Sequence, residues 1–264
     1  MTANTQRLCA EGILHNLQTH TLGKDLRFFD TVTSTFDVAE KLQVSDGTVI
    51  CAKAQTNGRG RLGRTWQSEQ GGIYFSLILA NRFTPEKLQL MTILCALGVQ
   101  IGLSGYISCK IKWPNDIITE NGMKLCGILT KLRSGDGCSD YINVGIGINA
   151  NTTDFDSELR YATSVRLQKG HKVDENKILC SVLEAIEGCL DMSEEEIIGQ
   201  YTQNCITAES RVRVIFAGDS GEFTGKCIGI NSDGSLNIQK NDGKLISVNS
   251  GEVSVRGVYG ENYV

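Results

Sequence analysis

The chain has 264 residues, of which 41% are hydrophobic and 21% are charged, the composition of an ordinary globular protein. Its formal net charge of −4 argues against a general nucleic-acid binder, because such proteins carry an excess of basic residues. The sequence has neither a signal-peptide pattern nor an apolar run of the roughly 20 residues that cross a bilayer, so we expect a cytoplasmic protein without a membrane partner.

Strand and helix patterns alternate along the first 205 residues. The run 73–79 is apolar nearly throughout, as in a central strand buried on both faces. Thr84, Pro85 and Glu86 form a helix start, with an N-cap, a proline in the first turn and an acid near the positive end of the dipole. In chain order the patterns predict a helix within 5–20, a strand at 26–29, a helix at 35–42, strands at 48–54 and 72–79, a helix at 84–103, strands at 108–113, 124–133 and 141–148, and helices at 174–190 and 194–203. These elements predict an α/β domain in which helices flank a mixed sheet.

The character of the sequence changes near residue 206. Short strand patterns follow, and turn signals such as Asn241-Asp242-Gly243, which is typical of a hairpin, separate them. This stretch predicts a small antiparallel β-barrel or sandwich that is stabilised by docking on its neighbour. We therefore predict two domains, at 1–205 and 206–264.

The ten cysteines include no Cys-x-x-Cys pair, and none has a histidine at ligand spacing. This pattern argues against a zinc site. Several cysteines, such as Cys51 and Cys95, lie in apolar runs, which favours buried free thiols in a reducing compartment.

The most informative stretch, 58–66, has the sequence Gly-Arg-Gly-Arg-Leu-Gly-Arg-Thr-Trp. Glycines let the backbone approach a ligand closely, and guanidinium groups match phosphate or carboxylate oxygens. A tryptophan at the end of such a loop can stack on a flat ring. The stretch therefore predicts an anionic, ring-bearing ligand, with a phosphate-bearing nucleotide as the first candidate. A flexible basic loop without a ligand, or an exposed nucleic-acid contact, is the alternative at this point.

Three further segments place polar residues or glycines at the ends of predicted strands. They are 112–116 (Lys-Trp-Pro-Asn-Asp), 124–129 (Lys-Leu-Cys-Gly-Ile-Leu) and 145–149 (Gly-Ile-Gly-Ile-Asn). Taken singly, each has an ordinary explanation: surface lysines, strand glycines at bulges and tryptophans in the core. Four such segments at four strand ends favour one shared site.

Together with Ser34-Thr35 and Gln55, these segments resemble the biotin protein ligase family, also called biotin–[carboxylase] ligases or holocarboxylase synthetases. They follow the family's order and spacing, and the resemblance spans roughly residues 26–264. It implies a catalytic domain like that of class II synthetases, with the biotin/lipoate ligase fold, followed by an SH3-like barrel. It also implies that biotin and ATP give biotinyl-5′-AMP and pyrophosphate, and that biotin then passes to a lysine of a biotin carboxyl carrier protein or domain.

The resemblance assigns roles to residues position by position. Ser34, Thr35 and Gln55 are expected to bind the ureido ring, Trp66 to pack against adenine, and Gly127 to leave room for the biotin tail. The predicted biotin-binding residues are Ser34, Thr35, Phe36, Gln55, Gly58, Arg59, Gly60, Arg61, Lys124 and Gly127; those for ATP are Arg59, Arg61, Arg64, Trp66, Lys112, Asn115 and Asn149; and the catalytic ones are Arg61, Lys112, Lys124 and Asp116. Asp116 is also the predicted contact for Mg²⁺, directly or through water or phosphates.

Phe36 departs from the family pattern, in which asparagine commonly follows Ser-Thr. Any hydrogen bond from that asparagine to biotin must be missing here or replaced by backbone. From its place in the first turn of a predicted helix, we expect Phe36 to face the core.

The resemblance further implies docking of a biotin-dependent carboxylase domain, for which the family precedent is an extended sheet formed with an edge strand. Some members carry an N-terminal winged helix-turn-helix, but the stretch before residue 26 is too short for one, so we expect a short form without specific DNA binding. A monomer and a homodimer both remain open. A lipoate or octanoate ligase or transferase of the same fold is the alternative function, and a non-catalytic module that keeps the pocket for storage or sensing is a third.

Overall fold

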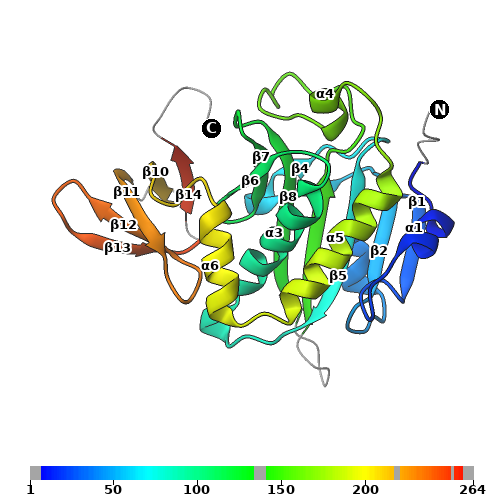
Figure 1. Ribbon diagram of the computed structural model, residues 1–264, viewed down its shortest axis with the longest axis horizontal. Coiled ribbons are helices and arrows are strands. Elements are labelled where there is room, and N and C mark those ends of the chain that lie inside the picture. The colour runs from blue at the N-terminus through cyan, green and yellow to red at the C-terminus, as the bar shows by residue number, and fades with distance from the viewer. Residues whose placement is uncertain (1–6, 134–140, 217–220, 251–252, 258–264) are drawn as a thin grey trace.

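A seven-stranded mixed sheet forms the body of the protein in the computed structural model, which describes residues 7–133, 141–216, 221–250 and 253–257 (Figure 1). The strand order is β1-β2-β5-β9-β8-β7-β6; β1 and β2 are parallel, and every other neighbouring pair is antiparallel. The strands are β1 (Leu26–Val32), β2 (Val49–Gln55), β5 (Ile73–Ala80), β6 (Cys109–Lys112), β7 (Asp116–Thr119), β8 (Lys124–Arg133) and β9 (Tyr141–Ile148). The predicted α/β class with a mixed sheet is confirmed.

Helices cover both faces of this sheet. α3 (Gln89–Ser104) and α5 (Glu175–Leu190) pack against each other across one face, and α6 (Glu194–Asn204) lies beside α3 (Figure 1). α2 (Thr35–Lys41) packs on β2, β5 and β9. The short helices α1 (Ala10–Asn16) and α4 (Val165–Lys169) lie near the sheet margins.

The side chains of β9 alternate between the two faces of the sheet. The even-numbered residues 142–148, all isoleucine or valine, belong to the main hydrophobic core with α3 and α5. Since successive side chains of a strand point to opposite faces, Gly145 and Gly147 lie on the other face. The second face carries a smaller cluster under α2, made of Ala39, Ile50 and Ile78. The glycines therefore leave part of this second face without side chains.

The second sheet has five antiparallel strands in the order β13-β12-β11-β10-β14. They are β10 (Arg211–Phe216), β11 (Glu222–Ile230), β12 (Leu236–Lys240), β13 (Leu245–Val248) and β14 (Val253–Gly257). The sheet lies beside α6 and β6 (Figure 1), and the Trp113 indole donates a hydrogen bond to the Gly234 carbonyl at 3.0 Å. The predicted antiparallel C-terminal module is therefore present and is joined to the main sheet close to β6.

Two predicted helices are shorter in the structure. The Thr84-Pro85 start opens only a 3₁₀ turn, Pro85–Lys87, and α3 begins at Gln89. The predicted helix within 5–20 is limited to α1, because the backbone N–H groups beyond Leu17 donate to the carboxylates of Glu184 and Glu187 on α5. Long-range partners thus replace the helical hydrogen bonds of that segment.

Two further observations concern the cysteines and the search for membrane-spanning helices. The nine cysteines in the described ranges are free and eight of them are buried, as predicted, while Cys138 lies outside those ranges. None of the described helices has the length and apolar character that crossing a bilayer requires.

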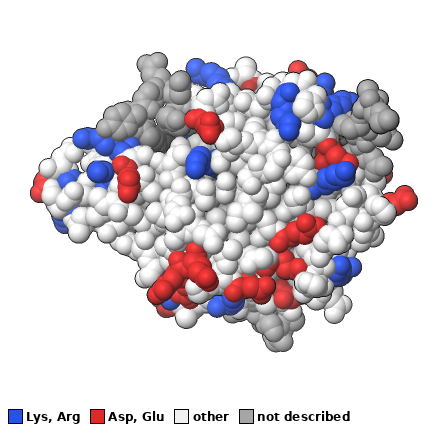
Figure 2. Space-filling model, in the orientation of Figure 1, with Lys and Arg blue, Asp and Glu red and all other residues white. Residues whose placement is uncertain are grey.

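On the face that carries α3 and α5, basic groups are interspersed with acidic ones, and the centre is largely uncharged (Figure 2).

Candidate active site

A cavity of about 370 Å³ lies over the glycine-bearing face of β8 and β9. The start of α2, the loop after β2, the β6–β7 turn, the beginning of β8, the segment after β9, and Val255 of β14 together line it. Four segments that are far apart in the sequence thus meet at one place, as their polar strand ends predicted. The predicted site residues that line the cavity are Ser34, Thr35, Phe36, Gln55, Arg59, Gly60, Arg61, Arg64, Trp66, Lys112, Asn115, Asp116, Lys124, Gly127 and Asn149.

Gly58 is the predicted site residue that lies outside the lining. It is buried and pairs with Trp66 in a two-stranded ribbon formed by β3 (Gly58–Arg59) and β4 (Thr65–Trp66). A side chain at Gly58 would collide with the Trp66 carbonyl and would lie 2.5 Å from Ser68 Oγ. Gly58 therefore allows the close approach that positions Trp66.

Arg61 lies in the cavity wall where the two sheets meet. Its Nη1 donates to Asn115 Oδ1 at 2.9 Å, and its Nη2 donates to the Ser250 carbonyl, which precedes β14. Burial lowers the pKa of the Arg61 guanidinium from its ordinary value, although an arginine stays charged. The backbone at Leu62 has a φ of 54°, a strained conformation for a non-glycine residue, in the turn Arg61–Gly63.

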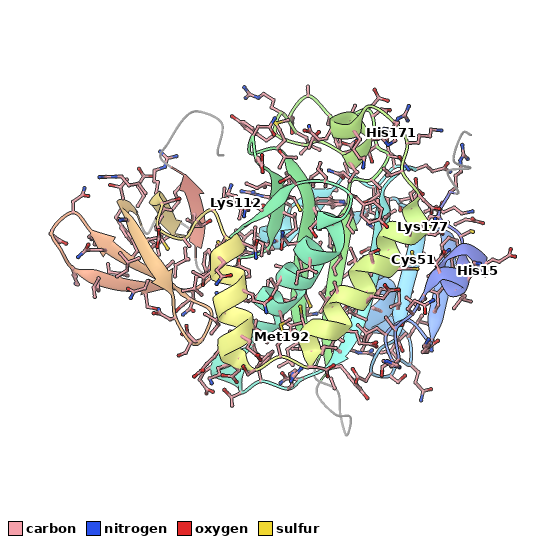
Figure 3. All side chains as sticks on the ribbon, in the orientation of Figure 1. His15, Cys51, Lys112, His171, Lys177 and Met192 are labelled. Carbon is pink, nitrogen blue, oxygen red and sulfur yellow. The ribbon has the colours of Figure 1, made fainter. Side chains whose placement is uncertain are left out.

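A second cationic group lies at the beginning of β8. Lys124 Nζ is 2.8 Å from Asp116 Oδ1 and 5.2 Å from the centroid of the Trp66 ring. Lys112 opposes Asp116 across the β6–β7 pair, and Figure 3 labels it where the main sheet approaches β14. Lys112, Lys124 and Arg61 therefore converge on the same end of the cavity, next to one carboxylate.

The other two arginines of the loop lie nearer to solvent. Arg59 makes a bidentate ion pair with Asp37 of α2, with its Nη2 at 2.9 Å from Oδ2. Arg64 is exposed and follows the turn that Gly63 closes with a φ of 74°. Both line the cavity, so they are available at its entrance.

Neutral polar groups gather where α2 begins. Gln55 Oε1 accepts hydrogen bonds from Thr35 N at 2.8 Å and from Thr35 Oγ1 at 3.2 Å, and Gln55 Nε2 donates to Ser68 Oγ. Ser34 is the N-cap of α2, yet its hydroxyl makes no capping bond. Ser34 Oγ is fully buried and has no hydrogen-bond partner among the described residues. Since buried polar groups are normally paired, this hydroxyl is free for a ligand.

Two aromatic rings cover the row of glycines. The Phe36 ring lies over Gly145, where an added Cβ would be 2.8 Å from Cδ2. The Trp66 indole spans Gly147 and Gly127, which oppose each other across β9 and β8; an added Cβ would be 2.5 Å from Nε1 at Gly147 and 2.7 Å from Cζ3 at Gly127. The room that Gly127 leaves is therefore filled by Trp66 in this structure.

Phe36 is buried, as expected, and it also lines the cavity. The side chain is only 7% exposed, but it belongs to neither hydrophobic cluster of the described residues, and it lines the cavity. The missing side chain at Gly145 lets the ring settle on the sheet at the edge of the cavity.

Sequence reasoning missed two parts of the wall. The segment 155–162 lines the cavity and is attached to β8, because Lys124 N donates to Tyr161 O and Thr163 N donates to Lys124 O. Its sequence signal is weak, because its apolar residues (Phe155, Leu159, Tyr161 and Ala162) recur without a regular period among polar ones. The second part is Val255 of β14, on the side from which the Ser250 carbonyl accepts a hydrogen bond from Arg61, and no local pattern indicates either feature.

The arrangement separates two kinds of recognition. One end offers uncharged hydrogen-bonding groups, and the other offers ammonium and guanidinium groups that can hold two anions together. Among the described residues no group of three or more histidine, cysteine, aspartate or glutamate side chains forms a metal site. A metal ion held mainly by ligand phosphates remains compatible with Asp116 and Asn115, because Mg²⁺ commonly uses one carboxylate plus phosphate oxygens.

Comparisons with known proteins agree with this geometry. Residues 28–149 match the Biotin/lipoate A/B protein ligase family, and residues 208–256 match the Biotin protein ligase C terminal domain. The Bifunctional ligase/repressor BirA of Bacillus subtilis (strain 168) is 32% identical over 252 residues, which cover 90% of this chain and 76% of that protein. The Biotin--[acetyl-CoA-carboxylase] ligase of Paracoccus denitrificans is 32% identical over 155 residues, 53% of this chain and 63% of that one.

Solved structures give the same result. The biotin protein ligase from Aquifex aeolicus in complex with biotin and ATP superposes with a TM-score of 0.78 at 32% identity, covering 89% of this chain and 99% of that chain. The Leishmania major biotin protein ligase in complex with biotinyl-5-AMP has a TM-score of 0.58 at 23% identity over 86% and 99% of the two chains, a likeness of fold.

Proposed function

Because this chain belongs to the biotin protein ligase family, we propose that it activates biotin with ATP and transfers it to a lysine of a biotin carboxyl carrier domain. The observation that carries the proposal is the convergence of Arg61, Lys112 and Lys124 on a cavity whose opposite end offers the unpartnered Ser34 hydroxyl. Biotin has a matching asymmetry, with a neutral ureido group at one end and a carboxylate at the other.

In the first step an oxygen of the biotin carboxylate attacks the α-phosphorus of ATP. The bond from that phosphorus to the bridging oxygen breaks, and pyrophosphate leaves with the electron pair. Two anions must approach each other, so the Lys112, Lys124 and Arg61 cations lower the barrier by stabilising the charge that gathers on the α-phosphoryl oxygens. Arg59 and Arg64 would hold the outer phosphates at the entrance.

The neutral end would bind the ureido ring. Ser34 Oγ is unpaired, and the Thr35–Gln55 hydrogen bonds fix the orientation of both side chains before a ligand arrives. Such preorganisation reduces the entropy that is lost on binding. Trp66 would receive adenine on the ring face turned away from Gly127 and Gly147, with Asn149 nearby.

Asp116 and Asn115 would contact Mg²⁺ together with the ATP phosphates. The ion supplies positive charge to the polyphosphate when it is bound. The residues present fit a phosphate-held ion better than a cage built by the protein alone, since the described cavity lining contains two acids, Asp116 and Glu158, and Asp116 is itself paired with Lys124.

In the second step the acceptor lysine amine attacks the biotinyl carbonyl carbon, AMP leaves, and the amine gives up a proton. An ordinary lysine has a pKa of about 10.4, so only about one in a thousand is neutral near pH 7.4. Asp116 would orient the incoming amine or accept its proton. The acceptor would dock as a strand beside β8, because β7 pairs with β8 only through Lys124–Gly127, and the following residues have no described strand partner on that side.

The decisive experiment is mass spectrometry of a candidate acceptor domain after incubation with the protein, biotin, ATP and Mg²⁺. We expect a gain of one biotinyl group on one lysine. Release of pyrophosphate without any acceptor modification would limit the activity to the first step. If neither pyrophosphate nor biotinylated acceptor is formed, the proposal is refuted.

The second candidate function is a lipoate or octanoate ligase, because the family that matches residues 28–149 is named for both biotin and lipoate ligases. Pyrophosphate release with biotin, lipoate and octanoate, measured side by side, separates the two functions. We expect biotin to be preferred, since the polar groups around Ser34 would remain unpaired with an acid that has no ureido group.

A further inference from the structure

We propose that Phe36 selects the sulfur-containing ring of biotin, so that this side chain decides between biotin and acids that share its ureido group and tail but lack that ring. The inference rests on the proposed function and extends it to specificity. It begins from the position of Phe36, which is buried, lines the cavity, and lies outside both hydrophobic clusters of the described residues. Its ring is therefore both a buried hydrophobic group and part of the cavity wall.

The ring is held firmly enough to act as a wall. The Phe36 carbonyl accepts a hydrogen bond from Asn143 Nδ2 at 3.1 Å, which ties the first turn of α2 to β9. The ring itself lies on the backbone of Gly145, where an added Cβ would be only 2.8 Å from Cδ2. A ring supported on one side by strand backbone presents its remaining surface to the cavity.

The polar neighbours of Phe36 define which part of the ligand meets it. Ser34, Thr35 and Gln55 supply hydrogen-bonding groups at this end, so they would take the ureido edge of the fused rings. The other edge of the fused rings is an apolar thioether. Phe36 is the aromatic residue beside these polar groups, and sulfur packs favourably against an aromatic ring. The opposite end of the cavity, with Lys124 5.2 Å from the Trp66 ring, is left for the tail and its carboxylate.

The test compares biotin with dethiobiotin, which keeps the ureido group and the acyl tail but has no sulfur. Pyrophosphate release gives kcat/KM for both acids with the unchanged chain, Phe36→Ala, Phe36→Leu and Ser34→Ala. We expect Phe36→Ala to lower the biotin-to-dethiobiotin ratio by about three- to tenfold, the range that a sulfur–aromatic contact supports, mainly through a higher KM for biotin. Phe36→Leu should lie between, because it restores apolar contact without an aromatic face.

Ser34→Ala is the matched control at the same end of the cavity. Its hydroxyl would serve the ureido group, which both acids carry, so both activities should fall by a similar factor and the ratio should stay within twofold of the starting value. A structural role for Phe36 alone would change stability and both acids together, and would leave the ratio unmoved.

A second variant changes Gly145, the residue whose backbone supports the Phe36 ring. Gly145→Ala places a methyl group under the ring and should push it toward the ligand, so it should lower the ratio while Phe36 itself is kept. Thermal melting identifies any variant that fails to fold, and Phe36→Leu is the most conservative of the set. Ratios within twofold of the starting value in every folded Phe36 and Gly145 variant would overturn the inference. Absence of any activation of biotin by the unchanged chain would instead refute the proposed function on which it rests.

Discussion

The Asp116 carboxylate lies 2.8 Å from the Lys124 ammonium group, and the two residues begin the neighbouring strands β7 and β8. The same ammonium group is 5.2 Å from the centre of the Trp66 ring. Lys124 is therefore held between a carboxylate and an aromatic face before any substrate is present. A substrate carboxylate or phosphate must compete with Asp116 for this cation. Substrate binding therefore changes the Asp116–Lys124 ion pair, so both residues take part in the sequence of binding and reaction steps.

Replacing Lys124 with glutamine should slow formation of biotinyl-5′-AMP by about 10²–10³, the usual effect of removing one preorganised charge-stabilising donor. Glutamine keeps much of the length but loses the charge that would hold the two anions together. Pyrophosphate release at saturating ATP measures the effect.

Lys53 offers a matched control for that variant. Its ammonium group is 2.7 Å from Asp30 and 5.7 Å from the Phe28 ring, so its surroundings resemble those of Lys124, but it lies outside the main cavity. Lys53→Gln should leave pyrophosphate release within twofold. A Lys124→Gln rate within threefold of the unchanged chain would contradict the role given to Lys124.

Replacing Asp116 with asparagine should separate the two steps. The neutral amide keeps an oxygen that can contact Mg²⁺ and no longer competes for Lys124, so pyrophosphate release should stay within threefold, whereas transfer from preformed biotinyl-5′-AMP to an acceptor lysine should fall at least tenfold. Single-turnover assays of each step measure the split. The opposite split, with the first step lost and transfer kept, would restrict the role of Asp116 to Mg²⁺ and ATP and contradict its proposed role in transfer.

Much of the site was predictable because its chemistry is concentrated in short segments. The glycine–arginine stretch and the segment 112–116 bring their cations to strand ends, and hydrophobic patterns predict those strands correctly. The packing of the aromatic rings on the glycines was harder to foresee. The place of the buried Phe36 ring at the cavity wall depends on Gly145, which is more than a hundred residues away in the chain.

The missed elements share a physical cause. β7 has only four residues and follows a turn at Pro114, so its hydrophobic pattern is too short to distinguish from a strand end. The segment 155–162 has no regular periodicity and is held by backbone hydrogen bonds to Lys124. Contacts of this kind, like that of Arg61 with the Ser250 carbonyl, depend on tertiary structure and leave no local signal.

Replacing Ser34 with alanine should weaken biotin binding without weakening the fold. The buried hydroxyl has no partner among the described residues, so its removal breaks no hydrogen bond in the free protein, and the melting temperature should stay unchanged or rise. The loss of a bond to the ureido group should raise the biotin KM roughly tenfold, which corresponds to about 1.4 kcal/mol.

Ser76 is the control for Ser34, since it is equally buried but its hydroxyl donates to Thr35 Oγ1 at 3.1 Å. Ser76→Ala breaks that bond and should lower the free energy of unfolding by about 1 kcal/mol. Thermal melts and calorimetric titration with biotin measure both effects. A melting temperature that falls as far in Ser34→Ala as in Ser76→Ala would show that the Ser34 hydroxyl has a structural partner.

Raising the pH above 9 should lower the free energy of unfolding, mainly because of the buried cysteines. Burial raises the pKa of Cys189 to about 11 and that of Cys109 to about 12, from an ordinary value of 9.0. Between pH 9 and 11 the unfolded chain therefore releases thiol protons that the folded chain keeps, so the free energy of unfolding falls as pH rises, by up to about 1.4 kcal/mol per pH unit for each such thiol. Urea unfolding under reducing conditions at pH 8, 9 and 10 measures the slope. Cys189→Ala removes one of these thiols and should reduce the loss between pH 9 and 10 by about 1 kcal/mol; an unchanged slope would mean that Cys189 ionises equally well in the folded protein.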